Sequence, residues 1–209
     1  MRISFYTFIS MLKTLSRLFV AVFFLTAAFG FIPEIYALEP IDSWTTDINL
    51  PFNLAGHSSV SFNNSLFIIT GSAQTFNSHN EVKYSQPGSN GVLSTWQNWA
   101  DYPKPMIWNA ATTKGNFIYG LGGFEEYSQG SKFSDEFVYF SQNSSSWNST
   151  TSLPTRLSKG SATVIGNYIY FTGGFTDNEN AGNASKKVYY ALINADGSLG
   201  SWNATTDLP

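Results

Sequence analysis

Apolar residues come in short runs along most of the chain. After residue 37, these runs are 4 to 8 residues long, are rich in Val, Ile, Tyr, Phe and Thr, and are bounded by Gly, Asn, Ser or Pro. Runs of this length and composition are typical of β-strands, and no window there has the period of an amphipathic helix. The pattern therefore predicts an all-β domain.

One of these runs recurs along the chain. The stretch GNYIYFTGGF (166–175) is almost repeated in GNFIYGLGGF (115–124) and more distantly in NSLFIITGSA (64–73). A Trp that is followed seven residues later by a Pro also recurs, in the pairs Trp44 and Pro51, Trp96 and Pro103, Trp147 and Pro154, and Trp202 and Pro209. Self-similarity at a period of about 50 residues indicates a repeat architecture.

Each repeat predicts four antiparallel strands, which we name A to D. Strand A covers 57–62, 109–113 and 160–165, strand B is the repeated stretch, strand C begins near residues 82, 137 and 188, and strand D carries the Trp. The Asn and Gly residues between strands A and B favour tight hairpins, because they tolerate positive φ. These strands define three blades, at about 52–99, 104–150 and 155–205, and leave one additional strand D around Trp44.

The order of these signals resembles the kelch repeat of β-propellers. The residues that carry the resemblance are the glycines that end strand B, the tyrosines before them and the tryptophans of strand D: Gly122, Gly123, Gly173, Gly174, Tyr119, Tyr170, Trp44, Trp96, Trp147 and Trp202. The first repeat departs from the pattern, because Gly71 is followed by Ser72 and Ile68 stands where the aligned repeats have tyrosine. The resemblance implies kelch-type β-propeller blades, as in the central domain of galactose oxidase, with Trp and Tyr filling the space between blades.

The number of blades is small for a closed ring. Propellers typically close with about four to eight blades. The additional strand D at Trp44 cannot complete the last blade, because that blade has its own strand D at Trp202. We therefore expect a piece of a longer propeller; a three-bladed protein and closure by association are the alternatives.

The N-terminus has the layout of a secretory signal. Basic residues precede an apolar run from Leu18 to Ile32, which is followed by Pro33 and by a small residue at Ala37. We expect cleavage after Ala37, an exported propeller over 38–209, and a location in the periplasm, outside the cell or at its surface. An uncleaved anchor is the alternative, although the run is shorter than the roughly 20 residues of a spanning helix.

Composition excludes several classes of function. The formal net charge is −3, with 11 basic and 14 acidic residues, so the chain is not expected to bind nucleic acid, nor membranes beyond the signal segment. The absence of cysteine removes disulfides, thiolate nucleophiles and the crosslinked tyrosine of a galactose oxidase copper site. His57 and His79 are the only histidines, and the run Asp177 to Asn180 lacks the spacing of a recognised calcium loop. We expect no metal and no cofactor.

Candidate binding residues come from the loops. Alternate connections emerge at the same end of an antiparallel blade, so the B to C loops and the D to A linkers share one end. The B to C loops are the longest and most polar. The candidate ligand-binding residues are Glu125, Glu126, Asp135, Arg156, Asp177 and Glu179. Ordinary loop solvation explains these residues equally well.

Two classes of function remain open. The first is a non-catalytic exported propeller that binds an extracellular protein or a carbohydrate. The second is a sugar-active enzyme resembling the periplasmic sialic-acid mutarotases, whose sites need only a few acidic, basic or amide groups. No arrangement of Ser, His and Asp and no phosphate-binding glycine loop favours catalysis, so the sequence favours the binding module.

Overall fold

The computed structural model describes residues 46–209 except 74–77, 127–131, 135–137, 142–145 and 177–183. Residues Asp47–Pro209 form one compact unit. All regular structure in the described part is β-strand, as the sequence predicts, and no helix there is long and apolar enough to cross a membrane. The expected signal segment 1–37 and Trp44 lie outside the described residues.

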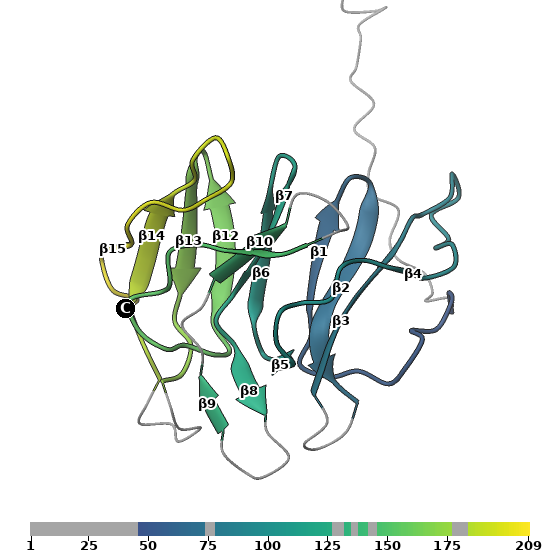
Figure 1. Cartoon of the computed structure of the whole chain (residues 1–209), viewed down its shortest axis with the longest axis horizontal. Helices are drawn as coiled ribbons and strands as arrows, with labels where there is room; N and C mark the ends of the chain where they lie inside the picture. Colours follow the sequence, from purple (N-terminus) through teal and green to yellow (C-terminus); the bar gives the residue numbers. More distant parts are fainter. Residues whose placement is uncertain (1–45, 74–77, 127–131, 135–137, 142–145, 177–183) are drawn as a thin grey trace, which may run out of the picture. The chain divides into compact units, whose positions relative to one another are not determined.

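Three four-stranded antiparallel sheets follow one another along the chain and lie side by side (Figure 1). The first contains β1 (Ser58–Phe62), β2 (Ser65–Ser72), β3 (Ser78–Ser85) and β4 (Gln97–Asn98). The second contains β6 (Ala110–Lys114), β7 (Phe117–Leu121), β10 (Val138–Ser141) and β11 (Asn148–Ser149). The third contains β12 (Ser161–Ile165), β13 (Tyr168–Thr172), β14 (Val188–Leu192) and β15 (Asn203–Ala204). The three predicted blades, each with strands A to D in order, are confirmed.

A small three-stranded sheet was not predicted. It contains β5 (Met106–Ile107), β8 (Phe124–Glu126) and β9 (Lys132–Ser134). β5 belongs to the linker before strand A, and β8 directly follows the Gly-Gly pair of strand B. The same linker pairs in the other blades as single bridges, Ala55 with Ser72 and Ser158 with Phe175. Each blade therefore fixes its linker to the end of strand B.

Strand A lies innermost among the three blades. β6 contacts both β1 and β12, so the first strands of neighbouring blades meet one another. The repeated stretch is strand B and is second in each sheet. The repeated stretch is therefore not the innermost strand, because the contacts of β6 place strand A there.

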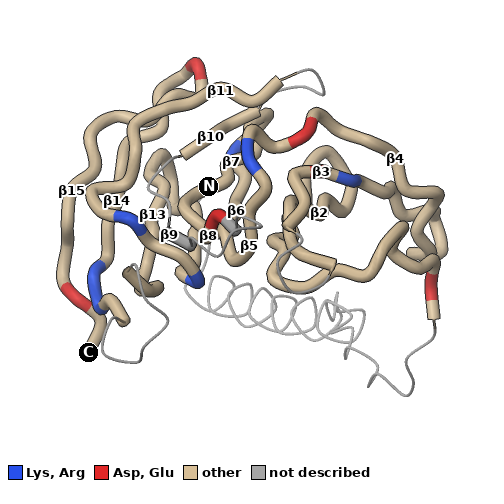
Figure 2. Tube along the Cα trace, turned by 60° about the horizontal axis from the view of Figure 1, so that its bottom comes forward, with Lys and Arg blue, Asp and Glu red and all other residues tan. Residues whose placement is uncertain are grey.

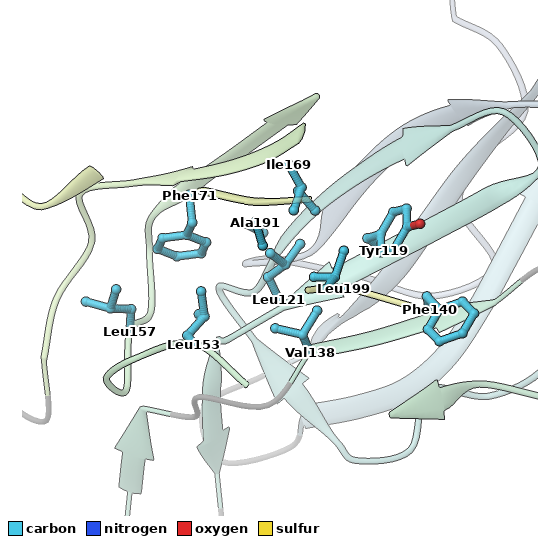
Figure 3. Packing of buried hydrophobic residues seen from close by; sticks show 11 residues of the cluster. Tyr119, Leu121, Val138, Phe140, Leu153, Leu157, Ile169, Phe171, Ala191 and Leu199 are labelled. Carbon is cyan, nitrogen blue, oxygen red and sulfur yellow. The ribbon is translucent and has the colours of Figure 1, made fainter. Parts of the chain in front are cut away.

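The hydrophobic core lies between neighbouring sheets. One cluster joins the first two sheets through Phe67, Ile69, Tyr102 and Ile118. The other joins the second and third sheets through side chains from β7, β10, β13, β14, the linker before β12 and the turn between β14 and β15. Figure 3 shows these side chains: Tyr119, Leu121, Val138, Phe140, Leu153, Leu157, Ile169, Phe171, Ala191 and Leu199. A twisted sheet cannot bury both of its faces alone, so each blade depends on its neighbours for burial.

Each repeated tryptophan donates a hydrogen bond to the chain segment that precedes its own blade. The indole nitrogen of Trp96 donates to the carbonyl of Asn49 at 3.0 Å. The indoles of Trp147 and Trp202 donate to the carbonyls of Ala100 and Thr151, each at 2.9 Å. One contact, repeated three times, therefore fixes the outer strand of each blade to the chain segment that precedes the blade.

The first repeat follows the pattern more closely than its sequence indicates. The A to B hairpins close at Phe62 and Ser65, at Lys114 and Phe117, and at Ile165 and Tyr168. Counting from these pairs, the counterpart of Tyr119 and Tyr170 is Phe67, so the expected counterpart Ile68 is wrong by one residue. Each of the three rings stacks on an aromatic ring of strand C, in the pairs Phe67 with Tyr84, Tyr119 with Phe140, and Tyr170 with Tyr190.

Candidate functional site

The residue two positions before each strand A has a left-handed backbone. These residues are Gly56, Trp108 and Lys159, with φ values of 65°, 55° and 56°. The amide of Trp108 donates to the carbonyl of Gly56 at 2.6 Å, and the amide of Lys159 donates to the carbonyl of Trp108 at 2.9 Å. We call these three residues the inner rim. It crosses all three blades at the end where strand B meets the B to C loops.

Aromatic rings position a lysine on the inner rim. The Lys159 ammonium lies 3.7 Å from the ring centroid of Trp108 and 5.6 Å from that of Phe175. The Trp108 ring in turn lies 5.5 Å from the ring of Phe124, which follows the glycines of strand B. A cation over an indole face is attracted by the ring quadrupole. The arrangement presents an exposed, aromatic-held positive charge at the innermost strands.

Asn109 adds a buried amide directly beside the inner rim. Its side-chain oxygen accepts hydrogen bonds from the Thr70 hydroxyl at 2.9 Å and from the Ser58 hydroxyl at 3.2 Å. The Ser58 hydroxyl also contacts the Asn109 carbonyl. Asn109 is 6% exposed, and its Nδ2 has no hydrogen-bond partner among the described residues. A buried amide donor costs free energy when it is unsatisfied, so Nδ2 is an unsatisfied polar atom beside the inner rim, although the atom itself is not exposed.

The two histidines have different surroundings. His57 follows Gly56 on the inner rim, and partial burial of its ring lowers the pKa of His57 below its ordinary value of 6.5. His79, in β3, lies 3.0 Å from the Glu81 carboxylate through Nδ1 and stacks on Phe52. Within the described ranges, no group of three or more His, Asp or Glu side chains is arranged to hold a metal ion.

The sequence-predicted site residues fall into three groups. Glu125 is in β8 and pairs with Lys104, with 3.5 Å between the carboxylate and ammonium atoms. Glu126 ends the same strand, and Arg156 is exposed in the linker before β12. The remaining three, Asp135, Asp177 and Glu179, lie outside the described residues. Figure 2 shows few charged positions along the described trace, consistent with the low charge of the sequence.

Sequence reasoning missed Trp108, Asn109 and Lys159 as a group. The aligned positions hold Gly56, Trp108 and Lys159, which share no residue type, so no repeat signal marks them. Their common property is the left-handed backbone, which glycine alone indicates in a sequence. The position of Asn109 at the start of strand A was predictable from the repeat register, but its hydrogen bonds to Ser58 and Thr70 of the first blade were not.

A depression lies at the opposite end of the second and third blades. Its volume is about 560 Å³, and the residues that line it come from the A to B turns and the C to D turn: Lys114, Gly115, Asn116, Phe117, Asn167, Ile193, Asn194 and Ala195. Lys114 is the one charged residue among those that line the depression, and its ammonium already donates to the Gly166 carbonyl at 2.5 Å. The inner rim therefore offers the stronger candidate site.

These sheets, packed face to face with strand A innermost, define β-propeller blades. The chain is similar to a solved structure of YjhT, with a TM-score of 0.62 and 16% sequence identity. The alignment covers 78% of this chain and 49% of YjhT, so the chain spans about half the length of that structure. At this identity the similarity bears on the fold alone. No family model matches the chain, and no curated protein matches it in sequence.

Proposed function

We propose that the protein is an exported, non-catalytic propeller module of kelch type that binds a carbohydrate at the inner rim. The observation that carries this proposal is the exposed Lys159 ammonium on the inner rim, which lies 3.7 Å from the ring centroid of Trp108. Hydroxyl and carboxylate oxygens of a sugar are acceptors that suit this donor.

The surroundings of these donors support the same proposal. Ligand sites combine apolar and aromatic walls with a few fixed polar groups. Trp108, which is partly exposed, supplies aromatic surface, the buried ring of Phe124 packs against it, and backbone hydrogen bonds along the inner rim fix the position of Lys159. The signal-like N-terminus and the low charge of the chain fit an exported carbohydrate-binding module better than a nucleic-acid or membrane protein.

The test is a carbohydrate array followed by calorimetry with the full chain. We expect at least one saccharide to bind and Lys159→Gln to weaken that binding about tenfold, which is the effect of losing one charge-assisted hydrogen bond. Lys114→Gln is the matched control, because it makes the same change of charge at the opposite end of the blades. Absence of saccharide binding, or equal loss in both variants, would contradict the proposal.

A sugar-active enzyme resembling the sialic-acid mutarotases is the second candidate. It is favoured by the Glu125 carboxylate, which is 19% exposed and pairs with Lys104 at the same end as the inner rim. A carboxylate and a cation held together are the groups that acid–base catalysis at an anomeric centre requires. Nuclear magnetic resonance of anomeric exchange separates the two candidates. Acceleration by the wild-type chain that Glu125→Gln abolishes would establish the enzyme, and unchanged exchange in the presence of a bound saccharide would exclude it.

A further inference from the structure

The outward face of the third sheet repeats a face that is buried in the second sheet. In the second sheet, Phe117, Tyr119 and Phe140 face the third sheet, and Tyr119 is completely buried. Their counterparts by hairpin register are Tyr168, Tyr170 and Tyr190. On this face Ile165, Tyr168 and Leu192 are 63%, 41% and 43% exposed. Large apolar side chains gathered on one sheet face mark an interaction surface.

The contacts that cover the second sheet show what such a face receives. The Tyr119 hydroxyl donates to the Gly197 carbonyl in the C to D turn of the third blade, at 2.9 Å, and Phe117 contacts the same glycine. Two residues further along this turn, the amide of Leu199 donates to Thr150 Oγ1 at 2.7 Å, and its carbonyl accepts from Thr151 Oγ1 at 2.6 Å. Together with the Trp202 indole, these bonds fix one blade to the preceding strand D and linker.

The third blade carries every one of the corresponding groups. Its strand D reads Trp-Asn-Ala-Thr-Thr at 202–206, where the second blade reads Trp-Asn-Ser-Thr-Thr at 147–151. The backbone follows the same path, since the amide of Thr150 donates to the carbonyl of Val138 and that of Thr205 donates to the carbonyl of Val188. Thr205 and Thr206 therefore stand where Thr150 and Thr151 bind the third blade.

We propose that the outward face of the sheet β12–β15 is a docking surface for one more four-stranded blade of the same repeat. The docked blade contributes a C to D turn of the form Gly-x-Leu, whose glycine carbonyl accepts from the Tyr170 hydroxyl. Its leucine amide and carbonyl bind Thr205 and Thr206. Its strand D contributes a tryptophan, whose indole donates to the Thr206 carbonyl.

A second copy of this chain does not fit that description. The first sheet has a matching turn at Gly91 to Trp96, but its groups already have partners in their own linker. The amide of Leu93 donates to the Asp47 carboxylate at 2.9 Å, and the Trp96 indole donates to the Asn49 carbonyl. Docking of a copy through its first sheet would force Thr205 and Thr206 to displace these residues. The occupant is therefore a blade of this repeat whose Gly-x-Leu turn and strand D tryptophan do not already have partners in a linker of their own.

The test extends the full chain by a second copy of residues 155–209. This junction preserves the local sequence, because Leu153, Pro154 and Thr155 become Leu208, Pro209 and the added threonine. The readout is amide hydrogen exchange in β13 and β14. We expect exchange there to slow about tenfold or more relative to the unextended chain, because the added blade covers the exposed face.

Two variants make the result specific. An extension that carries Trp202→Ala and Leu199→Asp in the added copy alone is expected to lose the protection, since it lacks the docking groups. Tyr168→Lys with Leu192→Lys in the original third blade is expected to abolish the protection while leaving the melting temperature of the unextended chain unchanged, because both side chains are exposed.

Three outcomes would overturn the proposal. The first is unchanged exchange in β13 and β14 of the extended chain. The second is an added blade whose own amides remain unprotected, because the face then fails to hold it. The third is sedimentation of the unextended chain as a dimer whose β13 and β14 amides are already protected, which would assign the face to a second copy.

Discussion

At the scale of single residues, strand B ends the same way in all three blades. Two consecutive residues there have positive φ: 58° and 117° at Thr70 and Gly71, 55° and 111° at Gly122 and Gly123, and 66° and 94° at Gly173 and Gly174. Glycine adopts these values without steric cost, whereas Thr70 is β-branched and strained by about 1–2 kcal/mol. The hydrogen bond from Thr70 to the buried Asn109 helps to hold this conformation beside the inner rim.

The second glycine of each pair cannot carry a side chain. A Cβ at Gly174 would lie 2.7 Å from the carbonyl oxygen of Ser158, and φ there is +94°. We expect Gly174→Ala to lower the free energy of unfolding by about 2 kcal/mol or more. Gly115→Ala is the control, because φ is +53° but nothing lies within 4 Å of the added Cβ, so its cost is limited to about 1 kcal/mol. Urea denaturation of both variants measures the difference, and equal losses would refute the steric argument.

At the scale of elements, each blade is held to its neighbour by a few polar bonds set in an apolar interface. The indole of each strand D tryptophan and the hydroxyl of Tyr119 donate to backbone carbonyls of the neighbouring segment. Buried aromatic side chains that carry a polar group require such partners. These bonds fix which carbonyl each blade meets, and the stacked aromatic pairs behind them supply the apolar area.

The Tyr119 hydroxyl tests this account. Tyr119→Phe removes its bond to Gly197 and leaves a buried carbonyl without that donor, so we expect a loss of about 1–2 kcal/mol in the free energy of unfolding. Tyr170→Phe is the matched control, since Tyr170 occupies the same register but is partly exposed, and its hydroxyl has no such acceptor in the described part of the chain. We expect a change within about 0.5 kcal/mol for the control. Similar losses in the two variants would show that the interblade bond contributes nothing.

The same hydroxyl predicts a dependence on alkaline pH. Burial, and secondly the charge of Asp196, raises the pKa of Tyr119 well above its ordinary value of 10.0. In the unfolded chain this phenol ionises near pH 10, while in the folded chain it stays neutral. Its contribution to stability is therefore complete below pH 10 and is lost as pH rises above that value. The difference in unfolding free energy between wild type and Tyr119→Phe, measured by denaturation from pH 8 to 11, is expected to shrink above pH 10. A constant difference would contradict the assignment.

At the scale of the whole molecule, repeated residues were predictable and unrepeated ones were not. The glycines, Tyr119 and the tryptophans recur at a fixed period, so the sequence predicts three blades and the aromatic packing between them. The small sheet at Phe124 and the inner rim depend on backbone conformation and contacts between blades, which have no repeated residue type. Of the candidate site residues, Glu125 lies in β8 and pairs with Lys104, but the donors Lys159 and Asn109 appear only once neighbouring blades are placed together.

Unequal burial of the three blades predicts unequal local stability. The second sheet has a neighbour on each face, through Ile118 on one side and Tyr119 on the other, whereas the third sheet has a described neighbour on one face only. In a repeat architecture stability is approximately the sum of each repeat and its interfaces, so the blade with two interfaces opens least. We expect amide exchange in β7 and β10 of the unextended chain to be slower than in β13 and β14 by about tenfold or more, which corresponds to about 1.4 kcal/mol.

Strands B and C pair in the same register in the second and third blades, so a difference in exchange between the two blades does not come from a difference in hydrogen-bond pairing. Equal exchange in the two blades would mean that the three sheets open as one cooperative unit, and faster exchange in β7 would refute the dependence of each blade on its neighbours.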